Sequence, residues 1–381
     1  KGVTKTQNPQ AYILKLNEAS NGKDTMTGHW EMMGLKTEKP FITFTDTGFP
    51  KEFIDLFEKK TGRKCVGNIA CSGTKILDMY GEHQIKTGDW IVYTSADSVF
   101  QIAANEDIIP LEELYHACQI AREIAMDDKW KVGRVIARPY IGTKKGHFTR
   151  TSNRHDYALA PFSKTALDSL KDAGLDVIGV GKIPDIFVDQ GITRKIKTVS
   201  NEDGMNKTIE LASDNFNGLA FINLVDFDAV YGHRRNAAGY GKAIEEFDVQ
   251  LGELINELKN DDLLMVTADH GNDPTYRGTD HTREQVPLII YSKQFNEMKV
   301  LNDSNSFGII GSTICDNFNV KYNGIGSSIL ELFKFIATYI LYIRSSKSSI
   351  STTADCSLSL HAFSINFCAR SLSLLSLVLH Q

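Results

Sequence analysis

The chain has 381 residues and a formal net charge of −5, from 42 Lys and Arg against 47 Asp and Glu. This length predicts two domains, and 42% hydrophobic with 23% charged residues is typical of a globular protein with a sizeable core. The mild acidic balance, without basic clusters, argues against a nucleic acid or an anionic membrane as partner. The composition also excludes a collagen, a coiled-coil rod and a disordered protein.

The cysteines form neither a CxxC pair nor a dense framework; they are Cys65, Cys71, Cys118, Cys315, Cys356 and Cys368. We therefore expect reduced thiols in a reducing compartment, which favours a cytoplasmic protein. No signal-peptide pattern opens the chain. The best membrane candidate, residues 329–343, is shorter than the ~20 apolar residues of a span and carries two charges, so no membrane is expected.

The chain begins with Lys1 rather than Met, in a polar stretch before the helix-like run AYILKL. We expect the natural start to be missing. Residues 40–161 contain several β-like runs (FITF, DWIVYTSA, RVIARPYI) and two helical runs around Phe53 and Leu111. This pattern predicts a separate α+β unit inserted into the first domain, which itself consists of residues 1–39 and 162–333.

The second half alternates strands with helices. Ser163 is a candidate N-cap for a helix that ends at Gly174, followed by a strand over 176–180. Further apolar runs at 218–225, 263–267 and 286–291 predict strands. Between the first two of these lies a helical stripe of apolar residues, namely Ile244, Phe247, Leu251, Leu254 and Leu258. The order predicts an α/β fold with a parallel sheet flanked by helices.

Residues 334–381 have a different composition. Ser and Leu dominate from 344 onward, with little charge and no clear period. Two interpretations remain open, a flexible extension or an artefact of translation past the true end. We assign this tail no function.

The strongest local signal is TADHGN, in which Asp269 and His270 follow an apolar strand. Ligand sites of open parallel sheets lie at such strand ends. Asp-His-Gly is also a plausible turn, so this motif alone leaves a metal site open. His281, eleven residues after His270, favours the metal.

A second cluster, in NLVDFDAVYGHRRN, follows the strand over 218–225 and contains Asp226, Asp228 and His233. Together the two clusters offer two carboxylates and three imidazoles, which are Asp228, His233, Asp269, His270 and His281. This ligand set suits two Mn²⁺, Zn²⁺ or Fe²⁺ ions better than Ca²⁺ or Mg²⁺, which prefer oxygen ligands.

A third signal is GKDTMTGHWE, residues 22–31. A hydroxyl here is most simply an N-cap. Beside two metal ions, however, Thr25 at a helix N-terminus becomes a credible phosphoryl acceptor, since the metals lower the hydroxyl pKa and the helix end stabilises phosphate.

At this point four segments resemble one family. GKDTMTGHWEMMG, NLVDFDAVYGHRRN, VTADHGNDPTYRGTDHTRE and GKIPDIF are similar to the phosphopentomutase family of the alkaline phosphatase superfamily, over residues 8–332 or so. The resemblance implies an alkaline-phosphatase-like core with a parallel-rich sheet and a smaller inserted cap. It implies phosphothreonine at Thr25, one Mn²⁺ on Asp228, His233 and His281, and a second Mn²⁺ on Asp269 and His270, with Thr25 between the ions.

The family interconverts ribose 1-phosphate and ribose 5-phosphate, and the deoxyribose analogues, through a pentose 1,5-bisphosphate. The resemblance thus implies small-molecule pentose phosphates as partners and a sugar bisphosphate as activator. It also assigns substrate contacts to Asp97, Arg134 and Lys182. Arg suits phosphate, Asp suits sugar hydroxyls and Lys offers a point charge, although each alone is more often a surface charge.

The sequence departs from the family at its start. Family members begin with a strand that ends in an Asp of the second metal site, and this sequence begins after it. We therefore expect an uncovered edge or a gap in the sheet, with lower stability and aggregation. We also expect a weakened second ion and a chain that is nearly inactive as a mutase. The competing functions are a hydrolase of the same superfamily, in which water reaches phospho-Thr25, and an inactive remnant that retains the fold.

Overall fold

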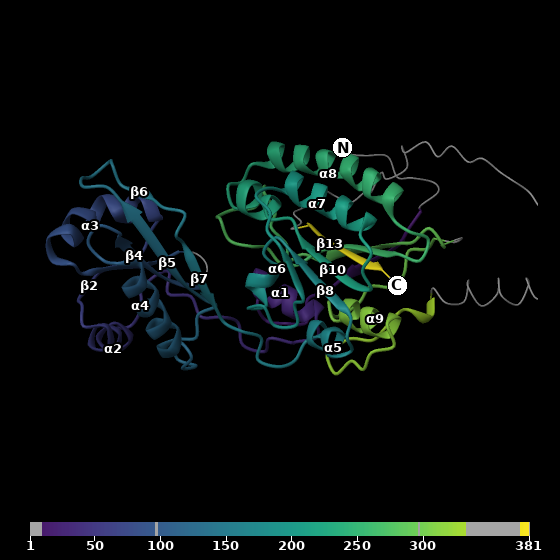
Figure 1. Ribbon diagram of the computed structural model, residues 1–381, viewed down its shortest axis with the longest axis horizontal. Helices are drawn as coiled ribbons and strands as arrows, with labels where there is room; N and C mark the ends of the chain where they lie inside the picture. Colours follow the sequence, from purple (N-terminus) through teal and green to yellow (C-terminus); the bar gives the residue numbers. More distant parts are fainter. Residues whose placement is uncertain (1–9, 96–97, 296–297, 333–373, 381) are drawn as a thin grey trace, which may run out of the picture. The chain divides into compact units, whose positions relative to one another are not determined.

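The computed structural model describes residues 10–95, 98–295, 298–332 and 374–380 (Figure 1). The chain forms two compact units. The inserted unit is Pro40–Ala160, and the core unit combines Lys1–Lys39 with Pro161–Gln381. Most of the membrane candidate 329–343 and of the Ser/Leu tail lies outside the described residues, as does Asp97. The described cysteines are free thiols: Cys65, Cys71, Cys118 and Cys315.

The inserted unit is built on a six-stranded sheet with the path β2-β3-β4-β5-β6, in which β7 also pairs with β5. Its strands are β2 (Cys65–Ala70), β3 (Trp90–Thr94), β4 (Val99–Asn105), β5 (Arg134–Ile141), β6 (Thr149–Arg150) and β7 (His155–Ala158). Its helices are α2 (Lys51–Thr61), α3 (Gly73–Thr87) and α4 (Leu111–Ile124).

Aromatic rings fill the core of the inserted unit. Phe100 lies 4.7 Å from Phe49, 4.9 Å from Phe53 and 5.5 Å from Phe57 by ring centroids, all in edge-on geometry. The helices predicted around Phe53 and Leu111 and the strands in DWIVYTSA and RVIARPYI are present. The strand predicted at FITF is wrong, because residues 41–44 belong to no strand. The backbone N–H of Ile42 donates to the carbonyl of Lys131 outside any ladder of strand pairs.

The core unit contains a seven-stranded sheet in the order β1-β12-β11-β13-β10-β8-β9. The strands are β1 (Tyr12–Leu16), β8 (Asp176–Val180), β9 (Arg194–Ile196), β10 (Gly218–Asn223), β11 (Leu263–Ala268), β12 (Val286–Tyr291) and β13 (Leu374–His380). The helix-like interpretation of AYILKL is wrong. Tyr12, Leu14 and Leu16 are buried while Lys15 is exposed, a period of two, and the segment pairs with β12.

The sheet is mixed rather than wholly parallel. Strand β8 runs parallel to β9 and β10, whereas β13 is antiparallel to β10 and β11, and β12 is antiparallel to β11 and β1. Five strands therefore share one direction and β12 and β13 oppose them. Our parallel assignment fails for 286–291 because the described chain between β11 and β12 contains no crossover helix, without which a strand returns antiparallel.

Helices cover both faces of this sheet, with α7 and α8 on one side and α5 and α9 on the other (Figure 1). The helices are α1 (Thr25–Met32), α5 (Ala166–Asp172), α6 (Ile183–Ile186), α7 (Asn201–Ser213), the π-helical η1 (Phe227–Gly232), α8 (Ala237–Glu257) and α9 (Ile309–Asn317). The predicted apolar stripe lies on α8. The predicted N-cap of α5 is wrong, because Thr165 rather than Ser163 caps it, in a reciprocal capping box with Asp168.

Strand β13 occupies the position where we expected a gap. It lies between β10 and β11 and pairs with both along its length, from Leu374 opposite Ala268 to His380 opposite Gly218. The described sheet is therefore continuous from β1 to β9. The expectation of a gap is wrong, because part of the Ser/Leu tail supplies the backbone donors and acceptors that β10 and β11 require.

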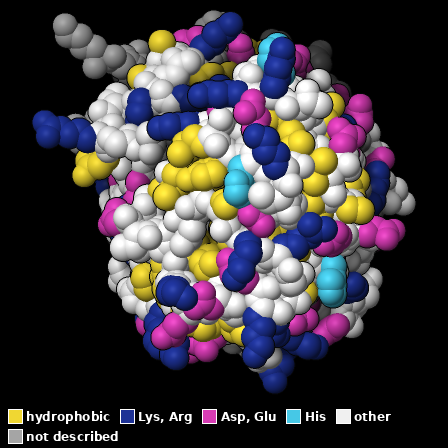
Figure 2. Space-filling model, turned by 90° about the vertical axis from the view of Figure 1, so that its left-hand side faces the viewer, with side chains coloured by type: hydrophobic (Ala, Val, Ile, Leu, Met, Phe, Trp, Pro, Cys, Tyr) yellow, Lys and Arg dark blue, Asp and Glu magenta, His cyan; other side chains and the backbone are white. Residues whose placement is uncertain are grey.

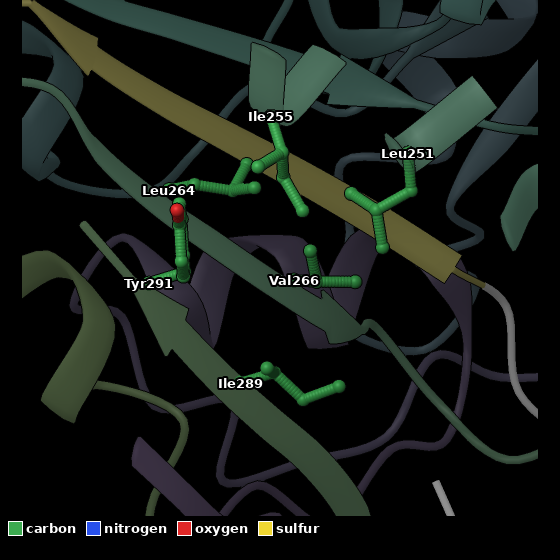
Figure 3. A pocket seen from close by; sticks show the side chains of 6 residues that line it. All are labelled: Leu251, Ile255, Leu264, Val266, Ile289 and Tyr291. Carbon is green, nitrogen blue, oxygen red and sulfur yellow. The ribbon is translucent and has the colours of Figure 1, made fainter. Parts of the chain in front are cut away.

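Two features of the surface and core limit where a ligand site lies. On the face drawn in Figure 2, Lys and Arg side chains are interspersed with Asp and Glu rather than gathered into one basic patch. A recess between α8 and strands β11 and β12 is lined by Leu251, Ile255, Leu264, Val266, Ile289 and Tyr291 (Figure 3). These side chains belong to the apolar core and offer no cluster of polar groups.

Within the described ranges, no helix combines the length and apolarity needed to cross a membrane.

The role of β13 predicts a loss of stability when its ladder is broken. Leu377 pairs with Phe221 and Met265, and Leu377→Pro removes a backbone donor in mid-sheet. We expect thermal unfolding of the full chain to show a loss of about 2 kcal/mol or more, several degrees in Tm. Thr352→Pro, outside the described residues, is the control. Equal midpoints for both variants would contradict the pairing.

Candidate metal centre

Helix α1 begins at the first candidate residue, Thr25. Asp24 is the N-cap and accepts hydrogen bonds from the backbone N–H groups of Met26 and Thr27, both at 3.1 Å. The hydroxyl of Thr27 donates to the second Asp24 oxygen at 2.6 Å. The Thr25 hydroxyl does not cap the helix; its Oγ1 lies 3.3 Å from Nε2 of His270. Of the two threonines, Thr25 therefore faces His270 and Thr27 serves the cap.

Asp269 and His270 follow β11 directly, and the start of α1 packs against them. A Cβ on Gly28 would lie 1.8 Å from the Asp269 carbonyl oxygen, so only glycine permits this approach. The Asp269 carboxylate is 1% exposed, and neither oxygen has a hydrogen-bond partner among the described residues. Its Oδ2 lies 3.3 Å from Nε2 of His270. A buried carboxylate without hydrogen bonds requires a positive charge nearby.

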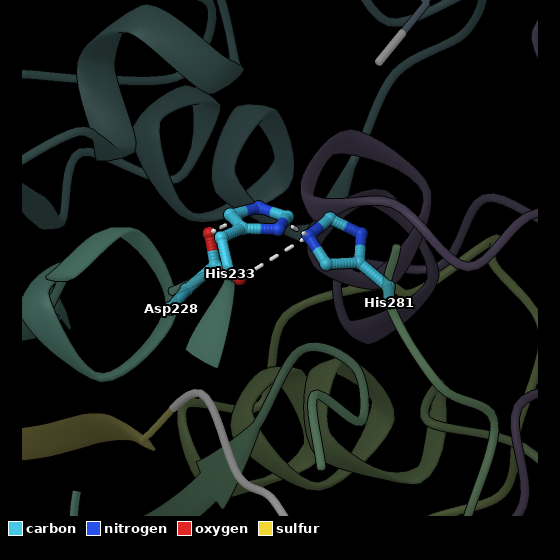
Figure 4. Close-up of side chains that lie close together, drawn as sticks. All are labelled: Asp228, His233 and His281. Carbon is cyan, nitrogen blue, oxygen red and sulfur yellow. Dashed lines mark hydrogen bonds and ion pairs between the residues drawn. The ribbon is translucent and has the colours of Figure 1, made fainter. Parts of the chain in front are cut away.

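Asp228 of η1, His233 directly after η1 and His281 from the segment between β11 and β12 converge into a second cluster (Figure 4). Nε2 of His281 lies 3.2 Å from Oδ1 of Asp228, and Nε2 of His233 lies 3.3 Å from Oδ2. The two Nε2 atoms are 3.1 Å apart. An ion about 2.0–2.1 Å from each of its tetrahedral ligands separates those ligands by roughly 3.3 Å, so the spacing fits a metal ion.

The Nδ1 atoms show which ring nitrogens are available. Nδ1 of His233 lies 2.6 Å from the carbonyl of Thr279, and Nδ1 of His281 lies 2.9 Å from that of Lys23. Nδ1 of His270 lies 3.1 Å from the Gly271 carbonyl. Since carbonyls only accept, each neutral ring carries its proton on Nδ1 and presents the lone pair of Nε2 to the cluster. This is the arrangement of histidines that bind metals.

The electrostatics keep the clusters in the form that binds cations. Burial acts to raise the pKa of Asp228, but the neighbouring imidazoles of His233 and His281 outweigh it and hold the pKa well below its usual range. Burial also opposes ionisation of Asp269, and His270 and His29 reverse this and lower its pKa. Burial lowers the pKa of His270, which favours the neutral ring.

The two clusters adjoin each other. The rings of His270 and His281 are stacked with centroids 3.8 Å apart. Three observations fit two bound cations: the types of ligand atom, the Asp269 oxygens without partners, and the Nε2 atoms that all face the clusters. One cation would lie at Asp228, His233 and His281, and the other at Asp269 and His270. Asp226, named with the second cluster, points away from it: its Oδ2 accepts from the backbone N–H of Asn201 at 2.7 Å.

Several supporting residues escaped the sequence analysis. The side-chain amide nitrogen of Asn272 donates to Oδ1 of Asp228 at 2.5 Å, and Arg235 donates to the side-chain oxygen Oδ1 of Asn272 at 2.7 Å. The ammonium of Lys23 donates to the carbonyl of His281 at 2.9 Å, reciprocating the bond from that ring. The signal was in the motifs, since Asn272 lies in TADHGN and Arg235 in GHRRN, but neither residue type is a typical metal ligand.

Glu18 adds an unexpected acid to this part of the core unit. Burial raises its pKa to about 9, against the opposing charge of Arg283, and Glu31, Asp24 and Asp269 contribute further in the same direction. Its Oε1 is buried and has no hydrogen-bond partner within the described ranges. A cation near Asp269 would lower this pKa by favouring the ionised form.

The substrate candidates lie in different units. Lys182 is the N-cap residue of α6 in the core unit. Arg134 opens β5 in the inserted unit, where its guanidinium lies 3.6 Å from Asp156, a residue that Arg154 also contacts at 2.7 Å. Asp97 falls outside the described residues.

Comparison with known proteins places the chain in a class. The model of the metalloenzyme superfamily matches residues 20–322, so the chain is a member of that superfamily. A solved phosphoglycerate mutase of Leishmania mexicana, 15% identical, covers 44% of this chain and 39% of its own with a TM-score of 0.36, which is too weak a likeness to inform the assignment.

Relatives in sequence are much closer. A phosphopentomutase of Clostridium beijerinckii is 60% identical over 333 residues, covering 87% of this chain and 84% of the relative. That of Clostridium tetani is also 60% identical, covering 86% and 84%, and that of Agathobacter rectalis is 59% identical, covering 85% and 82%. The chain belongs to the phosphopentomutase family of isomerases.

The contacts of Asn272 predict a defect in metal binding. Asn272→Ala removes the donor that orients Asp228, and loss of such a partner typically weakens a metal site 10- to 100-fold. We expect equilibrium dialysis with Mn²⁺ to show this loss, and a larger one for His281→Ala. Thr275→Ala, an exposed residue of the same loop, is the control. Wild-type affinity in both Asn272→Ala and His281→Ala would exclude this cluster as a metal site.

Proposed function

We propose that the chain interconverts ribose 1-phosphate and ribose 5-phosphate, and their deoxyribose analogues, by phosphoryl transfer through Thr25. Membership of the phosphopentomutase family supports the reaction. It opposes the expectation of little mutase activity from this chain, which stays a prediction that a product assay decides. The observation that carries the role of Thr25 is the position of its hydroxyl oxygen, 3.3 Å from His270 Nε2, the same nitrogen that lies 3.3 Å from the orphaned carboxylate of Asp269. It is a hydroxyl at a helix N-terminus, where phosphate is stabilised.

The proposed transfer has two steps. The free hydroxyl oxygen of the pentose phosphate attacks phosphorus on phospho-Thr25, the new O–P bond forms, the Oγ1–P bond breaks, and Oγ1 takes up the proton that the sugar hydroxyl releases. The product is a pentose 1,5-bisphosphate. In the second step Oγ1 attacks the other phosphate, its proton passes to the sugar oxygen, and phospho-Thr25 is restored. No net reactant is consumed, and a sugar bisphosphate activator supplies the first phosphoryl group.

Residues of both clusters prepare this transfer. The lone pair of His270 Nε2 accepts the Thr25 hydroxyl hydrogen, so the proposed nucleophile lies against the pair Asp269 and His270. We propose Mn²⁺ at each cluster, held by Asp228, His233 and His281 and by Asp269 and His270; bound there, the ions would stabilise the charge of the transferring phosphoryl group.

The first test distinguishes Thr25 from its neighbour. We expect Thr25→Ala to abolish transfer, because Oγ1 forms the bond to phosphorus. Thr27→Ser keeps a hydroxyl for Asp24 and is expected to retain a measurable rate. Mass spectrometry after incubation with a sugar bisphosphate should find phosphate on Thr25. Phosphate on Thr27, or none on the protein while the isomerisation proceeds, would overturn the mechanism.

The products identify the reaction. With ribose 5-phosphate, saturating Mn²⁺ and a bisphosphate activator, formation of ribose 1-phosphate supports the mutase. Free inorganic phosphate identifies the hydrolase, in which water attacks phospho-Thr25. No product of either kind, from a folded chain, identifies the inactive remnant.

Substrate binding gives a separate prediction. Arg134→Ala and Lys182→Ala should each lower kcat/KM on the order of 10-fold or more, because loss of a charge-assisted phosphate contact costs ~1.5–3 kcal/mol. Lys164→Ala, an exposed partner of Asp172, is the control. Steady-state kinetics that match the control for both variants would remove these residues from the substrate site.

A further inference from the structure

His29 lies on α1 one turn after Thr25, and the proposed reaction gives it no role. Its side chain is fully buried. Its Nδ1 lies 2.7 Å from the backbone carbonyl oxygen of Thr25 and 3.3 Å from Oδ2 of Asp269. One imidazole therefore contacts both the residue proposed as nucleophile and a residue proposed as metal ligand.

The protonation of this ring follows from its neighbours. The Thr25 carbonyl and the Asp269 carboxylate both only accept hydrogen bonds, so Nδ1 carries the proton. The hydrogen bond goes to the carbonyl, since neither carboxylate oxygen has a hydrogen-bond partner within the described ranges. The N–H dipole nevertheless lies beside Oδ2, and His29 contributes to the lowered pKa of Asp269.

The ring lies in a buried environment formed by an aromatic side chain and closely packed backbone. It packs against Phe221 with ring centroids 5.7 Å apart. The neighbouring Gly28 lies so close to the Asp269 backbone that a Cβ would be 1.8 Å from its carbonyl oxygen. Oδ2 of Asp269 thus lies 3.3 Å from each of two imidazoles: His270, which presents a lone pair, and His29, which presents an N–H.

We propose that His29 is a positioning residue, which orients the Asp269 carboxylate and the Thr25 backbone so that one cation meets both the carboxylate and the Thr25 hydroxyl. This inference rests on the proposed function, because it requires a cation at Asp269. His29 keeps its proton on Nδ1 and does not ligate the ion. Metal ligands are generally oriented by such hydrogen-bonding neighbours.

The test measures Mn²⁺ binding by equilibrium dialysis rather than activity. An Asn side chain places its amide nitrogen near the position of Nδ1, whereas a Gln side chain places it near Nε2. We therefore expect His29→Gln to weaken the ion that depends on Asp269 by 10- to 100-fold and His29→Asn to restore much of the affinity. Trp30→Phe, a buried neighbour on α1 whose indole bonds to the Ile186 carbonyl, is the control and should bind as wild type.

The Mn²⁺ ion at Asp269 is identified as the one whose binding is weakened in Asp269→Asn. If Asp269→Asn leaves all Mn²⁺ binding unchanged, the proposed second metal site fails and the inference fails with it. If Asp269→Asn weakens an ion while both His29 variants bind as wild type, only the inference is overturned. Equal losses in the two folded His29 variants, with Mn²⁺ retained at His281, would also overturn it, since the position of the N–H would then be irrelevant.

Discussion

Helix α1 and the end of strand β11 approach so closely that no side chain fits between them at Gly28. The rest of the centre depends on this contact. It places the helix N-terminus, with Thr25, against the Asp-His pair that follows the strand. A larger residue at position 28 would push the helix away from the strand, and the Thr25 hydroxyl would move away from His270. The Asp24 cap then determines which threonine faces the cluster, because it engages the hydroxyl of Thr27.

The centre is arranged around positive charge that side chains alone do not supply. The Nε2 atoms of His233 and His281 face each other at 3.1 Å. The proton of each ring lies on Nδ1, which donates to a backbone carbonyl. The nearby carboxylate of Asp269 is buried without a hydrogen bond from the described residues. Lone pairs and carboxylates packed so closely repel one another unless cations lie among them. Membership of the metalloenzyme superfamily agrees with this electrostatic argument.

The sheet shows how a fold satisfies its backbone from an unexpected part of the chain. Strands β10 and β11 carry residues that lead into the two clusters, and each needs a neighbour for its backbone groups. Strand β13 meets this need in antiparallel orientation. Its sequence has no clear alternation and little charge, so periodicity offered no reason to assign a strand there. Pairing with two buried strands overrides weak local preference.

Much of the centre was predictable from local sequence. The apolar runs of β10 and β11 and the stripe of α8 are short-range patterns, and metal-binding residue types follow directly after the strands. The direction of β12, the strand character of AYILKL and the position of β13 depended on tertiary pairing, because a short apolar run does not specify its neighbours. Tertiary structure alone also showed the contacts of Asn272, Arg235 and His29, since their partners are remote in sequence or lie across the packed interface of α1 and β11.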